Sequence, residues 1–521
     1  MRQYPLAIVL FSVLASAPIA LSRPAQAQPR PATADVKAPA AETPPPDESD
    51  SERRKRLARL GSGQVRYQAP IGEVHSLEAM VERVMEVNPQ VVARQYTRLY
   101  ATLRQDEANW WWFPEFEVGG KLTYVPHETD FNEVGSNLSQ YVNLDIGPLV
   151  QGSLRIVFPI TTFGKVDTLQ ELAALGIDQA DIEERKLRLE LIRKVREAYL
   201  SVQLGKLLEA LSADGNTLIK EEIARLDEAR EFGDEAVDIE ELRKLQIYEA
   251  ELDTKTIDTE RLIRLTRAAL TVLAQLKSAP WDVTPFDEDL DTNTLPPLSQ
   301  CLEIARQNRP DIVLLDKAVA ARKLQVDLAV TKFYPDIFFA VDLGTSYSTV
   351  EAPNQTGLVA SEPGEAPIPF ELEPLTDPFN YNRLAFALGL RLKVNPVNQY
   401  WKVQQARAQL SETEGLQAAA HEGIDLDVEK QWVEANDHRR KVEVLDRRLK
   451  AAERWRNQIS VAYQSGGAEF QDFIAPLKAY YEARVLLIKS KYDYLIALAW
   501  LAEKMGVTDI ENIAIEARGG E

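Results

Sequence analysis

The chain has almost no cysteine and little histidine. Its single cysteine, Cys301, excludes an intrachain disulfide. The four histidines are scattered through 521 residues, and no pair of them has the spacing of metal ligands. The sequence therefore predicts no histidine-rich metal centre and no bound cofactor.

Positive charge is also in short supply. The chain carries 80 Asp and Glu residues against 60 Lys and Arg residues, which gives a net charge of −20. Nucleic-acid backbones are gripped by Lys and Arg, so this balance argues against nucleic acid as a partner. The chain also lacks a phosphate-binding loop, a nucleophile motif and a metal-ligand cluster, so we do not expect an enzyme.

Long hydrophobic runs are missing as well. The longest, Leu6–Leu14, is shorter than the ~20 residues that span a bilayer as a helix. It follows Arg2 and precedes small residues ending in Ala25–Ala27, which predicts a cleavable signal peptide over residues 1–27. Residues 28–68 are rich in Pro and Ala and predict a disordered linker. We therefore expect an exported protein that no helix anchors in a membrane.

What the chain does have is an internal repeat. Residues 77–116 align without gaps on residues 298–337, and Pro89 and Pro114 match Pro310 and Pro335. This predicts two repeats, 69–276 and 298–506, joined by a linker at 277–297 and followed by a tail at 507–521. Each repeat has a helix, two strands, a long helix, a glycine break and a last helix. The expected ranges are 115–125, 150–158, 164–231 and 238–276 in the first repeat, and 336–347, 383–394, 399–464 and 471–505 in the second, with breaks near Gly233 and Gly466.

The expected strands alternate strictly between apolar and polar residues. In residues 383–394, Leu, Phe and Val occupy one face, and Arg, Lys, Ala and Gly occupy the other. Strands of this length suit a tilted crossing of a bilayer, with one face toward lipid. The predicted inward faces carry Glu117, Asp342, Lys121, Arg155, Arg391 and Lys393. This mixture suggests a general aqueous lumen; the alternative is a half-buried sheet in a soluble domain.

Four strands are too few to close a barrel, which needs about eight. Several copies of the chain must then share one barrel, and three copies would give twelve strands and room for a pore. The loops at 126–148 and 349–379 contain acids and no Lys or Arg. Either these acids only keep the loops soluble, or they form an acidic mouth that binds anionic lipid headgroups through divalent cations.

Residues 164–231 contain no proline and would form a helix about 100 Å long, with a kink expected at 212–216. Apolar residues recur at helical spacing here and in the last helix, as in coiled-coil packing. An ordinary soluble helical bundle would explain this spacing equally well. It would not explain the strand pairs or the signal peptide.

The duplicated order, together with "YQSGGAEF" at Tyr463–Phe470 and the apolar-spaced helix that follows it, resembles the TolC family of outer-membrane efflux proteins. The resemblance implies an α+β membrane protein. Three copies would form a 12-stranded barrel in the outer membrane and a long helical barrel in the periplasm. A belt would include residues 277–297. The implied partners are a periplasmic adaptor (membrane fusion protein), an inner-membrane pump of the RND or ABC type, and outer-membrane lipid.

The same resemblance implies that the glycine breaks are periplasmic tips that narrow the tunnel. Tyr463 matches the family's gating tyrosine, and Asp472 matches an acidic constriction residue. Two charged positions of the family pattern are Ala468 and Ala475 here. The expected tip residues are Tyr463, Gly466, Gly467, Glu469, Asp472, Gly233, Asp234, Glu235 and Asp238.

The leading hypothesis is a passive exit duct for efflux or type I secretion. The alternative is a secreted or periplasmic helical scaffold, or an adhesin, without a pore. The cargo is left open, since drugs, proteins, polysaccharides and metals all suit such a duct.

Overall fold

The computed structural model describes residues 50–60, 69–70, 72–128, 144–231, 239–276, 280–288, 295–349, 355–359, 368–372 and 379–510. The predicted signal peptide lies outside the described residues, as do Gly233, Asp234, Glu235 and Asp238. Most of the two acidic loops and most of the tail also lie outside them.

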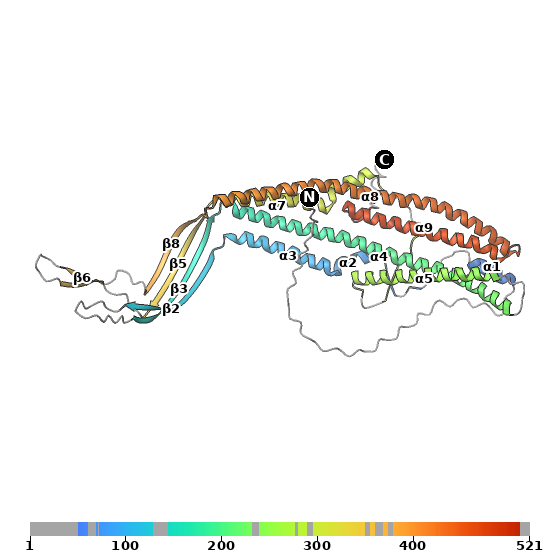
Figure 1. Cartoon of the computed structure of the whole chain (residues 1–521), viewed down its shortest axis with the longest axis horizontal. Coiled ribbons are helices and arrows are strands. Elements are labelled where there is room, and N and C mark those ends of the chain that lie inside the picture. Colours follow the sequence, from blue (N-terminus) through green and yellow to red (C-terminus); the bar gives the residue numbers. More distant parts are fainter. Residues whose placement is uncertain are drawn as a thin grey trace, which may run out of the picture. The chain divides into compact units, whose positions relative to one another are not determined.

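The first repeat is built mainly of helices (Figure 1). Its elements are β1 (Glu73–His75), α2 (Leu77–Val87), α3 (Pro89–Asn109), the short 3₁₀ helix η1 (Trp110–Trp112), β2 (Glu115–Glu128), β3 (Leu144–Thr161), α4 (Lys165–Glu231) and α5 (Ile239–Leu273). Ser76 and Asn88 accept hydrogen bonds from the first backbone N–H groups of α2 and α3, which fixes where these helices begin.

The second repeat follows the same order after a short strand, β4 (Trp281–Val283). Its elements are α6 (Leu298–Asn308), α7 (Pro310–Thr331), β5 (Asp336–Ser348), a small hairpin of β6 (Gln355–Val359) and β7 (Ile368–Leu372), β8 (Tyr381–Arg391), α8 (Pro396–Gln464) and α9 (Phe470–Met505). Pro89 and Pro310 both occupy the first turn of a helix, where a missing N–H costs nothing.

One prediction was wrong. Within the supposed disordered linker at 28–68, Asp50–Leu60 forms a helix, α1. The stretch contains no proline and is dominated by Arg, Lys, Leu and Ala, which favour the helix. Its arginines form ion pairs with α4 that give the helix a fixed place.

Several details differ from the sequence-based expectation; β3, for example, covers Leu144–Thr161 where residues 150–158 are predicted. Helix α4 runs without a break through 212–216, where a kink is expected, and Asn216 donates a hydrogen bond of 3.2 Å to Asp253 on α5. Strand β8 ends at Arg391 rather than at residue 394. The alternation continues past Arg391, but the neighbouring strand begins at Asp336, opposite Arg391, so residues 392–394 have no partner there.

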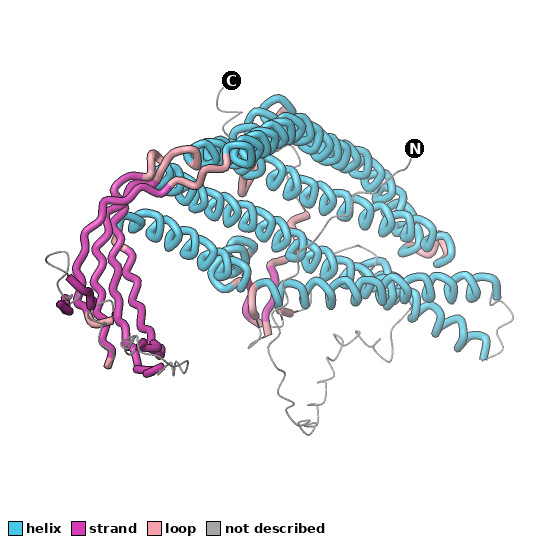
Figure 2. Tube along the Cα trace, turned by 60° about the vertical axis from the view of Figure 1, so that its left-hand side comes forward, coloured by secondary structure: helices cyan, strands magenta, loops and turns pink. Residues whose placement is uncertain are grey.

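The four long strands form one antiparallel sheet in the order β2-β3-β5-β8. Figure 2 shows them side by side, continuing from the ends of the helices. Each strand is paired in register with the next, so Val118, Leu154, Leu343 and Leu384 form one row across the sheet. The two repeats thus contribute two adjacent strands each to one sheet.

Two clusters of buried apolar side chains lie near the middle of the long helices α4 and α8. One cluster includes Met80, Val84, Val195, Tyr199 and Leu270 of the first repeat, together with Trp281 of the linker. In the second, Cys301 packs with Val428, Leu501 and Met505. Within the described ranges, no helix has both the length and the apolar character needed to cross a membrane.

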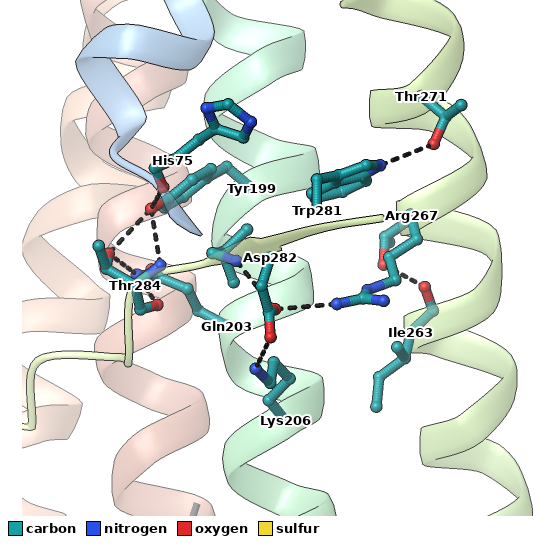
Figure 3. A network of polar contacts seen from close by, with 12 residues as sticks. His75, Tyr199, Gln203, Lys206, Ile263, Arg267, Thr271, Trp281, Asp282 and Thr284 are labelled. Carbon is teal, nitrogen blue, oxygen red and sulfur yellow. Dashed lines mark hydrogen bonds and ion pairs between the residues drawn. The ribbon is translucent and has the colours of Figure 1, made fainter. Parts of the chain in front are cut away.

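A buried charge network joins the linker between the repeats to the first repeat (Figure 3). Strand β4 pairs with β1 and places Asp282, which is fully buried, between two cations. Its carboxylate oxygens lie 2.7 Å from Lys206 Nζ on α4 and 2.8 Å from Arg267 Nη2 on α5. Next to it, Tyr199 donates a hydrogen bond to the carbonyl of His75. Asp282 therefore ties the linker to two helices at once.

We predict that Asp282→Ala lowers the free energy of unfolding by about 3–5 kcal/mol, because Lys206 and Arg267 would lose their shared counter-ion in a buried site. Thermal unfolding followed by the helical circular dichroism signal measures this. Asp258→Ala is the control, since Asp258 pairs with Arg261 on the exposed face of α5. Its loss should cost about 0.5 kcal/mol or less. Equal shifts in the two variants would contradict a structural role for Asp282.

Candidate functional sites: the four-stranded sheet and the hairpin tip

One face of the sheet is apolar and exposed. Val118 is 80% exposed, Leu388 75% and Leu122 71%, although all three lie in the middle of long strands. Phe339 stacks on Phe386 and lies beside Phe158 on this face. A soluble protein rarely leaves so continuous an apolar face in water, so this face requires a nonpolar environment.

The other face is polar and holds five of the six residues expected on the inward face. Arg155 lies in register with Glu117 and Asp342, and its Nε is 2.8 Å from Asp342 Oδ1. Lys121 lies farther along the sheet, opposite Gln151. Arg391 lies opposite Asp336, with its guanidinium 5.2 Å from the centroid of the Phe338 ring.

The structure thus brings Arg155 together with the two acids and leaves Lys121 and Arg391 in other rows. Lys393 lies beyond the end of β8 and belongs to no strand.

Aromatic residues gather where the helices meet the sheet, a feature that the sequence-based reading did not use. Trp110 and Trp112 stack with ring centroids 5.6 Å apart and are about 60% exposed. The other strands join their helices at the same border. There, Phe163 stacks on Tyr334, and Tyr400 packs against Trp401. Exposed Trp and Tyr at such a border are typical of a membrane–water interface. The run "WWWF" at 110–113 was the signal that could have revealed it.

The sheet has two open edges, β2 and β8. A row of backbone N–H and C=O groups on each edge has no partner within the sheet. Both edges are long and carry apolar side chains, so each is a template for pairing with another strand.

At the other end of the long helices, α8 turns into α9 at Gly466 and Gly467. Gly466 has a φ of +78°, in the left-handed region that favours glycine. The N–H of Gly467 donates to the carbonyl of Ala462 at 2.8 Å, and that of Gly466 to Tyr463 at 3.1 Å. These bonds satisfy the last carbonyls of α8, so the glycines end this helix in a tight cap.

The next helix begins with a reciprocal cap. Glu469 is the N-cap residue of α9, its carboxylate accepts a bond from the backbone of Asp472, and its own N–H donates to Asp472 Oδ2 at 3.2 Å. Both acids are exposed at the start of a helix, where negative charge is favourable. Asp472 therefore has a structural task besides any role of its charge.

Tyr463 lies inside the tip. It is 5% exposed, stacks on Phe473 with ring centroids 5.5 Å apart, and meets the edge of Phe470. Burial, and then the negative charge of Glu222, raise the pKa of Tyr463. Ala468 packs against the same apolar cluster, whereas Ala475 is exposed. In this chain Tyr463 is part of the packing that holds the hairpin.

Comparisons with known proteins agree with this geometry. The family model described as "outer membrane efflux protein" matches residues 301–507. A search of curated proteins by sequence found no match. The resemblance to TolC-like outer-membrane efflux proteins is confirmed by this match and by the solved structures.

Three solved structures illustrate the shared fold. The CmeC outer membrane channel of Campylobacter jejuni has a TM-score of 0.64 at 14% identity, and the match covers 92% of this chain and 97% of that one. The Neisseria gonorrhoeae MtrE outer membrane channel, in its open state, has a TM-score of 0.60 at 15% identity, covering 86% and 96%. CusC has a TM-score of 0.64 at 13% identity, covering 85% and 95%. At these identities the likeness establishes the fold.

We predict that Gly466→Ala destabilises the tip by about 1–2 kcal/mol, because alanine must adopt the left-handed conformation there. Gly467→Ala is a matched control, since a Cβ at residue 467 would meet its nearest atoms at ordinary distances of 3.6 and 3.8 Å. Hydrogen exchange of the amides in residues 460–475 measures the opening of the turn. Equal exchange in the two variants would show that the turn does not depend on the Gly466 conformation.

Proposed function

Because residues 301–507 match the outer membrane efflux protein family, we propose that the chain is one of three identical subunits of an outer-membrane exit duct. The duct conducts substrates passively from a periplasmic adaptor and an inner-membrane pump to the exterior. Its long helices extend into the periplasm, and its barrel lies in the outer membrane. It performs no catalysis.

The four-stranded sheet is the observation that carries this proposal. Its apolar face fits lipid, but in lipid the open edges β2 and β8 would leave backbone groups without hydrogen bonds, at several kcal/mol per group. Neighbouring strands alternate in direction, so β8 of one copy meets β2 of the next in the antiparallel sense. Three copies joined in this way close a barrel of twelve strands with the polar face inside.

The helices next to the two edges support the same assembly. Helix α3 leads into β2, and α8 follows β8, so closing the sheet brings α3 of one copy beside α8 of its neighbour. Both carry exposed apolar residues near the sheet: Tyr96, Leu99, Tyr100 and Leu103 on α3, and Val397, Tyr400 and Trp401 on α8. These side chains are available to pack between copies.

The polar face suits a duct for varied cargo. Arg155 and Asp342 neutralise one another at 2.8 Å, Glu117 lies in the same row, and Lys121 and Arg391 lie in other rows. No single sign of charge dominates this face, so it favours an aqueous lumen over a selective filter. The surface therefore fits efflux and type I secretion alike, with an RND or ABC pump.

A scaffold or adhesin without a pore is the competing function. Such a protein has no use for an apolar sheet face as exposed as that around Val118 and Leu388. A scaffold would leave the membrane fraction in high salt, whereas a barrel requires detergent.

We predict that cysteines on the two edges cross-link copies into dimers and trimers. Leu122→Cys on β2 and Leu384→Cys on β8, combined in one chain and treated with a flexible bis-maleimide, should give this ladder on a denaturing gel. Leu154→Cys with Leu343→Cys is the control, because these two residues pair in register within one chain. The native Cys301 is fully buried, and burial raises its pKa to about 11, so it will not react.

A ladder from the control pair, or monomers alone from the edge pair in detergent-solubilised membranes, would contradict the shared barrel. Loss of the ladder on unfolding in SDS before the reagent is added shows that it reports the assembly.

We further predict that the acids of the tip set its ion selectivity. In a trimer, three copies of Asp472 and Glu469 form negative rings, so Asp472→Asn should lower the cation selectivity of single channels by about twofold. Asparagine keeps a side-chain oxygen for the Glu469 N–H, whereas Asp472→Ala removes both the charge and the cap. Planar-bilayer recording measures selectivity. Unchanged selectivity in both variants would remove Asp472 from the constriction.

A further inference from the structure

Helix α1 lies at the end of the long helices that carries the hairpin tip (Figure 1). Two of its arginines form ion pairs with α4. Arg53 Nη2 is 2.7 Å from Glu222 Oε2, and Arg56 Nη1 is 2.9 Å from both carboxylate oxygens of Glu221. Glu222 is 1% exposed and also binds Arg225, so a buried acid is held by cations from two helices.

The arginine between these two contacts the second repeat. The Arg54 guanidinium lies over the Tyr463 ring, 5.6 Å from its centroid. Its Nη1 is 3.4 Å from the position that a Cβ would occupy at Gly466. Helix α1 thus contacts α4 of the first repeat and the turn of the second repeat at once.

The contacts described for α1 are made by charged side chains. Arg53, Arg54 and Arg56 are half-buried against the tip, and Lys55 is exposed on the other side. Among residues 51–56, whose side chains are described, none belongs to the apolar cluster beneath, which includes Leu218, Leu226, Tyr463 and Phe473. An isolated helix of 11 residues is marginal in water, so α1 depends on these contacts to stay folded. Salt screens partly buried ion pairs less than exposed ones, so only high salt should weaken these contacts.

We propose that Glu221, Glu222, Tyr463 and Gly466 form a docking site for a basic helix, and that α1 occupies it as a strap between the two hairpins of the subunit. While α1 is bound to both, α4 cannot move away from the α8–α9 turn without breaking either the two ion pairs or the contact with Tyr463. Opening the tip therefore requires α1 to detach. The claim that α1 docks at this site is independent of the proposed function. The claim that its release opens the tip rests on that function.

Hydrogen exchange of the amides of residues 50–60 in the full chain tests docking. Arg56→Glu should accelerate their exchange at least tenfold, because Glu221 would then repel the helix and an undocked α1 melts. Lys55→Glu makes the same charge change on the exposed side and should leave the rate within twofold. Arg56→Glu combined with Glu221→Arg restores an ion pair of opposite polarity and should restore protection. Raising sodium chloride to molar concentration should accelerate exchange in the native chain.

Fast exchange in the native chain at low salt, or equal rates in Arg56→Glu and Lys55→Glu, would overturn docking. Single-channel recording of the same variants tests opening, and Arg56→Glu should raise the open probability severalfold while Lys55→Glu does not. If Arg56→Glu removes the protection of residues 50–60 from exchange but leaves the open probability unchanged, the strap's role in gating would be overturned. Absence of any channel in the native protein would contradict the proposed function and leave the exchange result standing.

Discussion

The constraint on which the structure depends is that a sheet in lipid can have no open edge. A chain with four long strands cannot meet it alone, so in the duct that we propose, the edges β2 and β8 pair with other copies. The exposed apolar residues of α3 and α8 follow from the same constraint, because these helices continue from the two edge strands. Features that look costly in one chain, such as Val118 at 80% exposure, fit an assembly in which lipid covers that face.

Much of the architecture could be predicted from the sequence because it follows local patterns. The alternation in residues 383–394 determined the sheet's two faces, and the glycine pair at 466–467 located a turn. The repeat placed two adjacent strands in each half. The ends of β8 were less predictable, since the alternation runs on to Val394 whereas the strand ends where its neighbour β5 begins. A strand's end is decided by its partner, and a single strand's sequence does not contain its partner.

The contacts that join distant segments were not predictable, for the same reason. Asp282 is one acid in an acidic linker until β4 pairs with β1 and brings Lys206 and Arg267 to it. Residues 50–60 look like the end of a disordered stretch until Glu221 and Glu222, far along the chain, give the arginines a place. Tyr463 was expected at a constriction by resemblance, and its burial against Phe473 became visible when α9 folded back on α8. In each case the decisive neighbour lies many residues away.

The tip shows how one departure from the family pattern is compensated. The resemblance to the family implies an arginine where this chain has Ala468, and an arginine there would place a charge against the cluster of Phe470, Phe473 and Leu477. Alanine avoids that desolvation and packs with the cluster. The tip still holds buried negative charge at Glu222, and the cations that neutralise it come from Arg225 and from α1. The positive charge missing from the turn is thus supplied by a separate helix. A charge on a separate helix can leave without unfolding the turn, whereas one built into the turn cannot.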